Sequence, residues 1–424
     1  DDVTIVTGDV TAARTGIAIS GSGDDIRIDT TAGAIDGVAG NGIDVNYSYP
    51  FSSGSFSGDV TLLTSDISAA ETAIKIAAGG ASNIAIDTTE GAVTGGNGLA
   101  IGIRFARERM QITTADVVGD IETYSARELI KIDTTKGTIS GNIRPLSLDG
   151  SDIQIKTADV IGTDSGITAV SAESIGGNIR IDTTGGSIGK GSDESTFGNG
   201  IRAYADNNGF IEITTADINS AKTGLEARVG IYDPGGEKRI TSGSIAIDTT
   251  RGKILALEGN GLDAETLGVD YGDIKIIASN VTGSLNGIQA ETYYGGDIRI
   301  DVTAGKVEGK DGYGIEARTR GGGYRFSNYQ GVGAQTSNRI KVLTSEVIGR
   351  KGGISIIQNV DFDARVDYRN VDIFIDTTMG SVSASNGKGI SVIGSYNGDI
   401  SISTADVSGS TDGVGISRST LSQV

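Results

Sequence analysis

The chain has 424 residues, of which 54 are acidic and 35 basic, for a formal net charge of −19. This charge repels phosphate groups and argues against nucleic acid as a partner. Glycine is abundant at 66 residues and proline rare at 3, a balance that excludes collagen and proline-rich disorder. No run of about 18 apolar residues occurs, so we expect no part of the chain to span a membrane as a helix.

The chain is built from a repeat that alternates between two forms. The first form reads Ile-x-Ile-Asp-Thr-Thr-x-Gly-x-Ile, and the second reads Ile-x-Ile-x-Thr-Ala-Asp-Val. Seven copies of the first form begin at Ile26, Ile84, Ile130, Ile179, Ile245, Ile298 and Ile373. Eight copies of the second form begin at Val3, Val60, Met110, Ile153, Ile211, Ile274, Ile340 and Ile400. Such interleaved repetition is the signature of a solenoid, in which each repeat stacks on its neighbours.

Residues 178–203 show the elements of one repeat. Residues 179–181 alternate apolar and polar side chains, the pattern of a strand with one buried face. A turn at 182–186, a short strand at 187–188 and a third strand at 200–203 follow. The sequence therefore predicts an all-β fold, a single right-handed parallel β-helix (a solenoid) of about fifteen coils with three short strands each and long loops from one corner. The handedness is assigned by analogy with known β-helices, and we expect one continuous domain over 1–424.

The fifth and sixth coils depart from this pattern. Residues 118–129 and 142–150 lack the Gly-Ile pair that opens the third strand elsewhere. Pro145 stands where a strand would need a backbone N–H, which proline does not have. We expect a local narrowing or kink here, with one strand lost.

Aspartates recur at one position of each repeat form. The first form carries Asp29, Asp87, Asp133, Asp182, Asp248, Asp301 and Asp376. Copies of the first form are two coils apart, about 9.6 Å, which is too far for two carboxylates to share one calcium ion. Because aspartate accepts hydrogen bonds from nearby backbone N–H groups, we interpret these residues as turn caps and expect no metal site.

Long insertions follow the third strand, and two of them, 316–338 and 355–372, belong to consecutive coils. They are rich in arginine and aromatic residues: Arg318, Arg320, Tyr324, Arg325, Phe326, Tyr329, Phe362, Arg365, Tyr368 and Arg369. Tyrosine and arginine are enriched at binding hot spots, and arginine matches carboxylate and sulfate groups. The hypothesis is a binding site for an anionic glycan or an acidic receptor loop. The alternative is that these loops fold over the coils and bury their own aromatic side chains.

The alternating repeats resemble the passenger regions of autotransporters and related large surface adhesins of Gram-negative bacteria. The resemblance covers the whole chain as a style of repeat and carries over no catalytic residue. It implies a protein secreted to the bacterial cell surface through an outer-membrane β-barrel translocator that belongs to the full-length protein. We therefore expect 1–424 to be a fragment of a longer secreted protein, and a monomer.

The expected function is an extracellular adhesion or host-interaction module of a virulence protein, which presents loops from a rigid β-helical rod. The expected partner is a host cell-surface protein or an anionic glycan. Histidine is absent, which rules out a Ser-His-Asp triad in this chain, and we expect neither an enzyme nor a cofactor. Three alternatives remain: a purely structural stalk, a released effector that binds a host receptor, and a carbohydrate-active enzyme.

Overall fold

The computed structural model describes fifteen segments of the chain, and it divides into two compact units, Asp1–Ala205 and Asp206–Val424. The described residues are 2–21, 25–47, 58–78, 83–124, 126–148, 150–162, 168–190, 198–206, 209–230, 243–267, 272–293, 295–321, 338–360, 371–394 and 398–418. Throughout these ranges the regular structure is β-strand.

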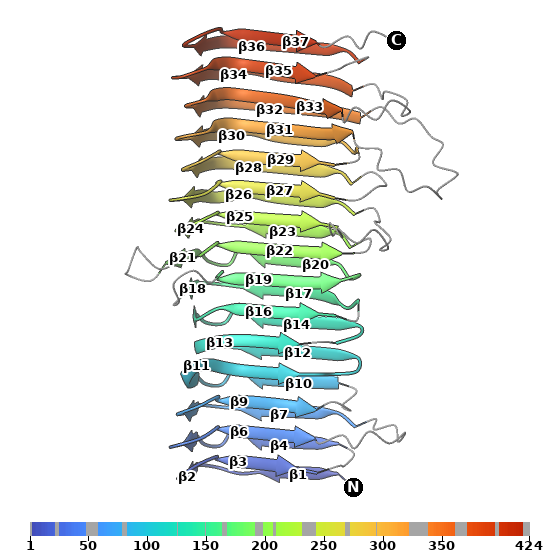
Figure 1. Ribbon diagram of the computed structural model, residues 1–424. Helices are drawn as coiled ribbons and strands as arrows, with labels where there is room; N and C mark the ends of the chain where they lie inside the picture. Colours follow the sequence, from blue (N-terminus) through green and yellow to red (C-terminus); the bar gives the residue numbers. More distant parts are fainter. Residues whose placement is uncertain are drawn as a thin grey trace, which may run out of the picture. The chain divides into compact units, whose positions relative to one another are not determined.

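The first unit stacks eight coils (Figure 1). Its strands are β1 (Val3–Val6), β2 (Val10–Ala12), β3 (Ile17–Ser20), β4 (Ile26–Thr30), β5 (Ile35–Gly37), β6 (Ile43–Tyr47), β7 (Val60–Thr64), β8 (Ile67–Ala69), β9 (Ile74–Ala78), β10 (Asn83–Thr88), β11 (Val93–Arg104), β12 (Arg109–Thr114), β13 (Val117–Tyr124), β14 (Leu129–Thr134), β15 (Ile139–Ser140), β16 (Ile143–Ser147), β17 (Asp152–Thr157), β18 (Val160–Gly162), β19 (Val170–Ile175), β20 (Ile179–Thr183), β21 (Ile188–Lys190) and β22 (Ile201–Asp206).

The second unit stacks seven coils. Its strands are β23 (Ile211–Thr215), β24 (Ile218–Ser220), β25 (Leu225–Val229), β26 (Ile245–Ala256), β27 (Leu262–Thr266), β28 (Ile274–Gly283), β29 (Ile288–Thr292), β30 (Ile298–Gly309), β31 (Tyr313–Gly321), β32 (Asn338–Gly349), β33 (Gly352–Val360), β34 (Val371–Ala384), β35 (Lys388–Gly394), β36 (Ile400–Gly409) and β37 (Val414–Arg418).

Within each unit every strand pairs in parallel with its equivalent one coil away. In the second unit, for example, β28 pairs with β30 and β30 with β32, which stacks Ile276, Ile300 and Val342 on one another. All three side chains are fully buried. Parallel pairing of coil on coil around an aliphatic interior confirms the predicted parallel β-helix. None of the described residues forms a helix with the length and apolar character needed to cross a bilayer.

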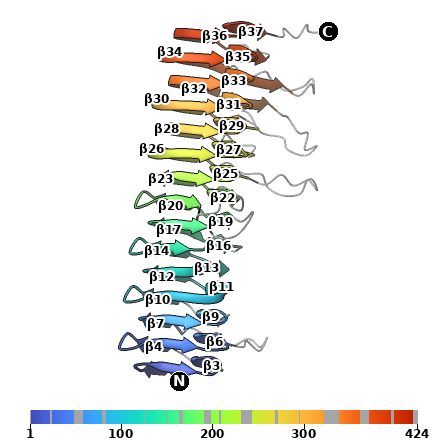
Figure 2. The same ribbon diagram turned by 90° about the vertical axis from the view of Figure 1, so that its left-hand side faces the viewer.

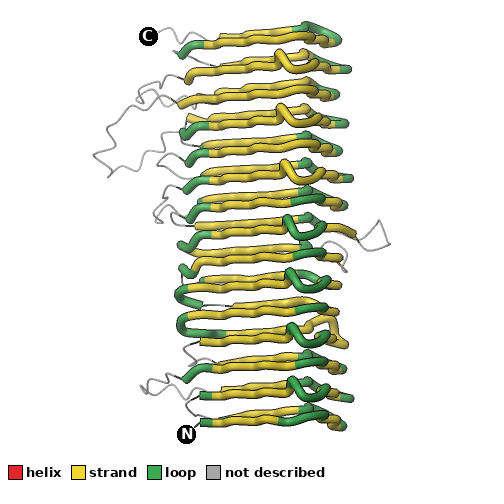
Figure 3. The backbone as a smooth tube through the Cα atoms, turned by 180° about the vertical axis from the view of Figure 1, so that it is seen from behind, coloured by secondary structure: helices red, strands yellow, loops and turns green. Residues whose placement is uncertain are grey.

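The expected three short strands per coil are partly merged. In the first unit β11 and β13 each run through both the second and the third strand of their coils. In the second unit β26 and its equivalents run through the first and second strands, with a register shift between Thr249 and Lys253. Figure 3 shows this corner as continuous strand in several coils of the second unit and as loop in the first. The pairing of β26 with β28 is interrupted at this corner after Thr249 and resumes at Lys253.

The fifth and sixth coils keep their third strand, so the expected loss of a strand is wrong. Pro145 lies in β16, turned inward and buried, and pairs with Thr123 in the preceding coil. On the other side of β16, where it meets β19, Ile143 and Leu146 are paired but the two residues between them, including Pro145, are not. The missing N–H of proline thus removes one stretch of pairing, while the neighbouring coils hold the strand in place.

The aspartates of the first repeat form cap turns, as expected. Each accepts a hydrogen bond from the backbone N–H two residues later, in the pairs Asp29–Thr31, Asp87–Thr89, Asp133–Thr135, Asp182–Thr184, Asp248–Thr250, Asp301–Thr303 and Asp376–Thr378. In the first unit these turns protrude in every second coil, after β4, β10, β14 and β20 (Figure 2). Carboxylates used in this way are local structural groups.

The aspartates of the second repeat form, which we also expected to cap their own turns, instead act between coils. Asp9, Asp66, Asp116, Asp159 and Asp217 accept a hydrogen bond from a backbone N–H of the following coil, at 2.7–2.9 Å. The donor is Ala34 for Asp9 and Lys253 for Asp217. One repeat form therefore supplies a local turn cap and the other a hydrogen bond to the next coil.

A column of glycines opens the third strands of the second unit, and we predict that its members covered by a further coil tolerate no side chain. A Cβ at Gly261 would lie 2.5 Å from Cγ1 of Val281 and 2.7 Å from the carbonyl oxygen of Gly287. Gly261→Ala should therefore lower the free energy of unfolding by about 1–3 kcal/mol, the usual cost of overpacking. The matched control is Gly413→Ala, in the same column, where the nearest atom is 3.6 Å away. Equal losses in denaturant unfolding of the two variants would contradict the prediction.

Candidate functional site

The residues of the sequence-predicted site fall into two groups. Tyr324, Arg325, Phe326, Tyr329, Phe362, Arg365, Tyr368 and Arg369 lie outside the described residues. Arg318 and Arg320 are described, and they lie in β31, because that strand continues to Gly321. The insertion predicted at 316–338 thus begins later than expected, and the one predicted at 355–372 begins after β33 has reached Val360.

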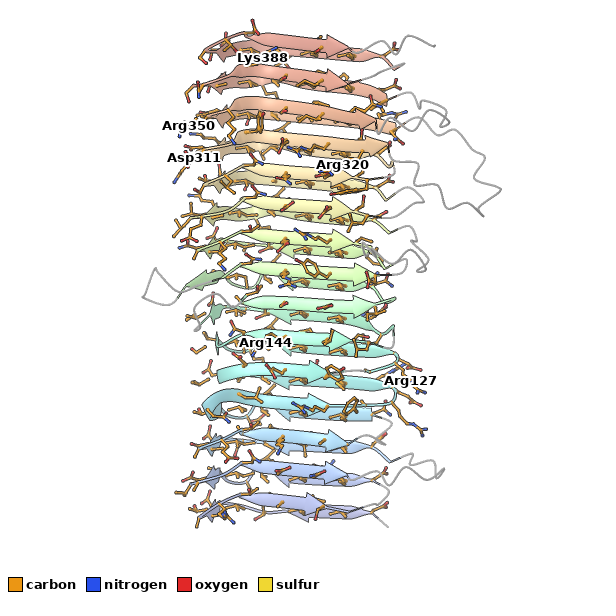
Figure 4. The ribbon with its side chains drawn as sticks, in the orientation of Figure 1. Arg127, Arg144, Asp311, Arg320, Arg350 and Lys388 are labelled. Carbon is orange, nitrogen blue, oxygen red and sulfur yellow. The ribbon has the colours of Figure 1, made fainter. Side chains whose placement is uncertain are left out.

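Arg318 and Arg320 belong to a polar surface that we call the third-strand face. It consists of the outward side chains of β25, β27, β29 and β31, together with Tyr293, which directly follows β29. The pairing registers place Glu226 beside Asp263, Asp263 beside Gln289, and Gln289 beside Glu316. The complete set is Glu226, Arg228, Asp263, Glu265, Gln289, Glu291, Tyr293, Glu316, Arg318 and Arg320. Figure 4 shows Arg320 on this face, where β31 nears its end.

Both predicted arginines are paired with carboxylates. Arg318 Nη2 lies 2.5 Å from Oε1 of Glu316, two residues earlier on the same strand. Arg320 pairs with Glu291 of the preceding coil, and its guanidinium carbon lies 4.6 Å from the centre of the Tyr293 ring. Such a contact combines an ion pair with a cation–π interaction. The sequence stretch from Ala317 to Asn338 contains no acid, but Glu316 and Glu291 outside it pair with these two arginines.

A second ion-pair group lies on the same face. Arg228 binds Glu226 of its own strand, with Nη2 2.9 Å from Oε1. It also binds Glu265 of the next coil, with Nε 3.1 Å from Oε2. The Arg228 side chain is 42% exposed, so one of its faces remains accessible to solvent. Arginine therefore pairs with carboxylates at both ends of the third-strand face, and Arg228 bridges two of them.

Several groups on this face have shifted pKa values. Burial raises the pKa of Asp263 from its ordinary 3.8 to about 6; Arg228 opposes this rise, while Glu226 and Glu265 add to it. Burial also raises the pKa of Glu291 against the opposing charges of Arg320 and Arg318. It raises the pKa of Tyr293 to about 12, helped by Glu291. The charge on this face therefore changes between mildly acidic and neutral pH.

The sequence contains a signal for this face that lies outside the two repeat forms and was missed for that reason. The tetrapeptides Glu-Ala-Arg-Val, Asp-Ala-Glu-Thr, Gln-Ala-Glu-Thr and Glu-Ala-Arg-Thr follow the glycine column at 226–229, 263–266, 289–292 and 316–319. Each alternates a polar outward residue with a small inward one. Once the coils are stacked, these four segments align, and Glu291 lies beside Arg318 in the register of β29 and β31.

The chemistry available on the face is recognition and proton exchange. Five carboxyl groups and three arginines share the face, and the arginines already pair with carboxylates, so a partner would contact their remaining N–H groups and the tyrosine ring. The Asp263 carboxyl can exchange a proton near neutral pH, which a general acid also needs. Across the described segments there is no group of three acidic, histidine or cysteine residues that could hold a metal ion.

The fold places this chain in the class of parallel β-helix proteins. Comparisons with protein-family models, with curated proteins and with solved structures found no match. The support for a function therefore comes from the residues of the chain itself.

Proposed function

We propose that this chain is an extracellular adhesion or host-interaction module, part of an autotransporter passenger displayed at the bacterial cell surface. The observation that carries the proposal is the third-strand face, where arginine, tyrosine and carboxylate side chains of four successive coils form one surface. Its partner would be a host cell-surface protein or an anionic glycan. The resemblance of the repeats to passenger regions supports the location, and the face supports binding.

Rigidity favours binding at this face. Arg228, Arg318 and Arg320 are held by ion pairs to carboxylates of their own or a neighbouring coil. Side chains that are already ordered lose little conformational entropy when a partner binds, so more of the contact energy contributes to affinity. Arginine and tyrosine are also the residue types that dominate binding hot spots. The module would work by surface complementarity, with no covalent chemistry.

The test is binding of the purified chain to host cells and to a glycan panel. Arg228→Gln combined with Arg318→Gln should weaken binding about tenfold or more, the effect of losing charge-assisted hydrogen bonds. Arg299→Gln is the matched control, because Arg299 is 49% exposed and lies on a first strand of the same unit. Circular dichroism must show that all proteins are folded.

A further variant tests the insertion that the sequence predicts at 316–338. Tyr324→Ala/Arg325→Ala/Tyr329→Ala should also weaken binding if the insertion contributes to the same partner site. Absence of binding by the folded wild-type chain would contradict the proposal and favour a purely structural stalk.

A carbohydrate-active enzyme is the second candidate, and the raised pKa of Asp263 is the observation that favours it. If the chain is such an enzyme, the wild-type protein should release reducing or unsaturated sugar ends from an acidic polysaccharide. That release should disappear in Asp263→Asn. Binding without cleavage would exclude this candidate.

A further inference from the structure

A second surface, in the first unit, repeats one tripeptide in consecutive coils. Ala106-Arg107-Glu108 follows β11, and Ala126-Arg127-Glu128 follows β13. The pairs Arg104–Tyr124 and Arg109–Leu129 on either side align the two corners. Both alanines are buried, which anchors each corner on the coil and leaves the next residue directed outward. Arg107 and Arg127 are therefore equivalent positions one coil apart, about 4.8 Å.

These two corners are basic in a strongly acidic chain. Arg104, Arg107, Arg109 and Arg127 carry four positive charges against two negative charges from Glu108 and Glu128, a local excess of two. Arg109 Nε forms an ion pair with Glu128 Oε2 at 3.0 Å. Arg104 and Arg127 are exposed. Figure 4 shows Arg127 directed away from the coils.

An exposed aromatic residue stands at the same corners. Phe105 is 49% exposed and adopts a φ of 65°, the one positive φ at a non-glycine residue in the described part of the chain. Its ring meets the Tyr124 ring edge-on, with centroids 5.3 Å apart, and its N–H donates to the Tyr124 carbonyl at 2.9 Å. A bulky residue in this region of backbone space is strained, and glycine would suit the position better. An apolar side chain kept exposed at the expense of stability indicates a surface used for contact.

We propose that this arginine–aromatic corner binds an acidic polysaccharide through its carboxylate or sulfate groups. The guanidinium groups match such anions in geometry and charge. The two coils that carry Arg107 and Arg127 lie about 4.8 Å apart, close to the length of one sugar unit, so neighbouring sugars of one polymer can meet both coils. The rings of Phe105 and Tyr124 offer an apolar surface to the C–H face of a sugar. The net charge of −19 of the chain opposes nucleic acid and acidic polysaccharide alike, so a single-stranded oligonucleotide serves as the competing ligand.

The inference rests on the proposed function and deepens it by adding a surface in the other unit. The experiment titrates the whole chain with three oligosaccharides of equal length: a heparin-type sulfated one, a galacturonate one and a neutral dextran. We expect the two acidic ligands to bind more tightly than dextran. Which of the two has the higher affinity shows whether the site prefers sulfate or carboxylate groups. Arg104→Gln/Arg127→Gln should weaken acidic-glycan binding about tenfold or more, whereas Arg27→Gln, at an exposed arginine elsewhere in this unit, should not.

Phe105→Gly provides an independent readout. Glycine relieves the positive φ but also removes the ring contact with Tyr124, so we expect little change in melting temperature together with weaker glycan binding. Equal binding of dextran, equal binding of a single-stranded oligonucleotide of the same charge, or unchanged binding by Arg104→Gln/Arg127→Gln would overturn the inference. The two proposals can be told apart. If acidic-glycan binding persists in Arg228→Gln/Arg318→Gln but is lost in Arg104→Gln/Arg127→Gln, the result supports this corner and counts against the third-strand face.

Discussion

Replacing Asp263 with asparagine should stabilise the protein at neutral pH. The carboxyl of Asp263 is half-buried between Glu226 and Glu265, and its pKa is raised from 3.8 to about 6. At pH 7.5 the folded chain carries this charge in an unfavourable place, whereas the unfolded chain carries it in water. A rise of roughly two pKa units at about 1.4 kcal/mol each makes the penalty up to about 3 kcal/mol. Asparagine removes the charge and can still accept from the Asn260 side chain, which lies 3.4 Å from Oδ2.

The pH dependence has a definite sign. Between about pH 4 and 6 folded Asp263 retains a proton that the unfolded chain has lost, so the contribution of this group to stability falls as pH rises through this window. Urea unfolding of Asp263→Asn at several pH values should show this slope removed. Asp376→Asn is the matched control of opposite sign, since the hydroxyl and N–H of Thr378 lower the pKa of Asp376. Replacing Asp376 with asparagine removes a carboxylate that these hydrogen bonds stabilise, so it should slightly destabilise the protein at neutral pH. A wild-type slope that persists in Asp263→Asn would refute the assignment.

Arg320→Met should destabilise the second unit by about 3 kcal/mol, the lower end of the range for breaking a buried ion pair, because Arg320 itself is half-exposed. The Glu291 carboxylate is buried, and without Arg320 it loses its main compensating charge. The loss should be smaller at acidic pH, where Glu291 can take up a proton. Methionine retains an apolar stem beside Tyr293, so the measured change reports mainly on charge.

A double-mutant cycle tests this pairing. Glu291→Gln in the Arg320→Met background should recover most of the lost stability, because the buried charge is then gone. Arg299→Met is the control: its ion pair to Asp301 spans 3.8 Å and is exposed, so a change within about 0.5 kcal/mol is expected. Strict additivity of Arg320→Met and Glu291→Gln in denaturant unfolding would show that the two side chains are not coupled.

The error at Pro145 shows where local reasoning about a solenoid fails. Proline indicates a broken strand when one repeat is considered alone. In the fold, β16 lies between two coils of regular strand, and pairing with β13 is enough to hold it. The error at Arg318 and Arg320 has a related origin. Their partners Glu316 and Glu291 were visible in the sequence, but the neighbour relation comes from the stacking of coils.

The sequence by itself determined the class of fold, the inward and outward positions of the strands and the role of the aspartate turn caps. These features depend on contacts within a few residues, or on a period-two pattern that repeats in every coil. Only the tertiary structure decided which outward side chains meet, because insertions of unequal length separate one coil from the next. The ion pairs of the third-strand face and the alignment of Arg107 with Arg127 depend on that register. The raised pKa of Asp263 has the same origin, since it results from burial and charge contributed by three different strands.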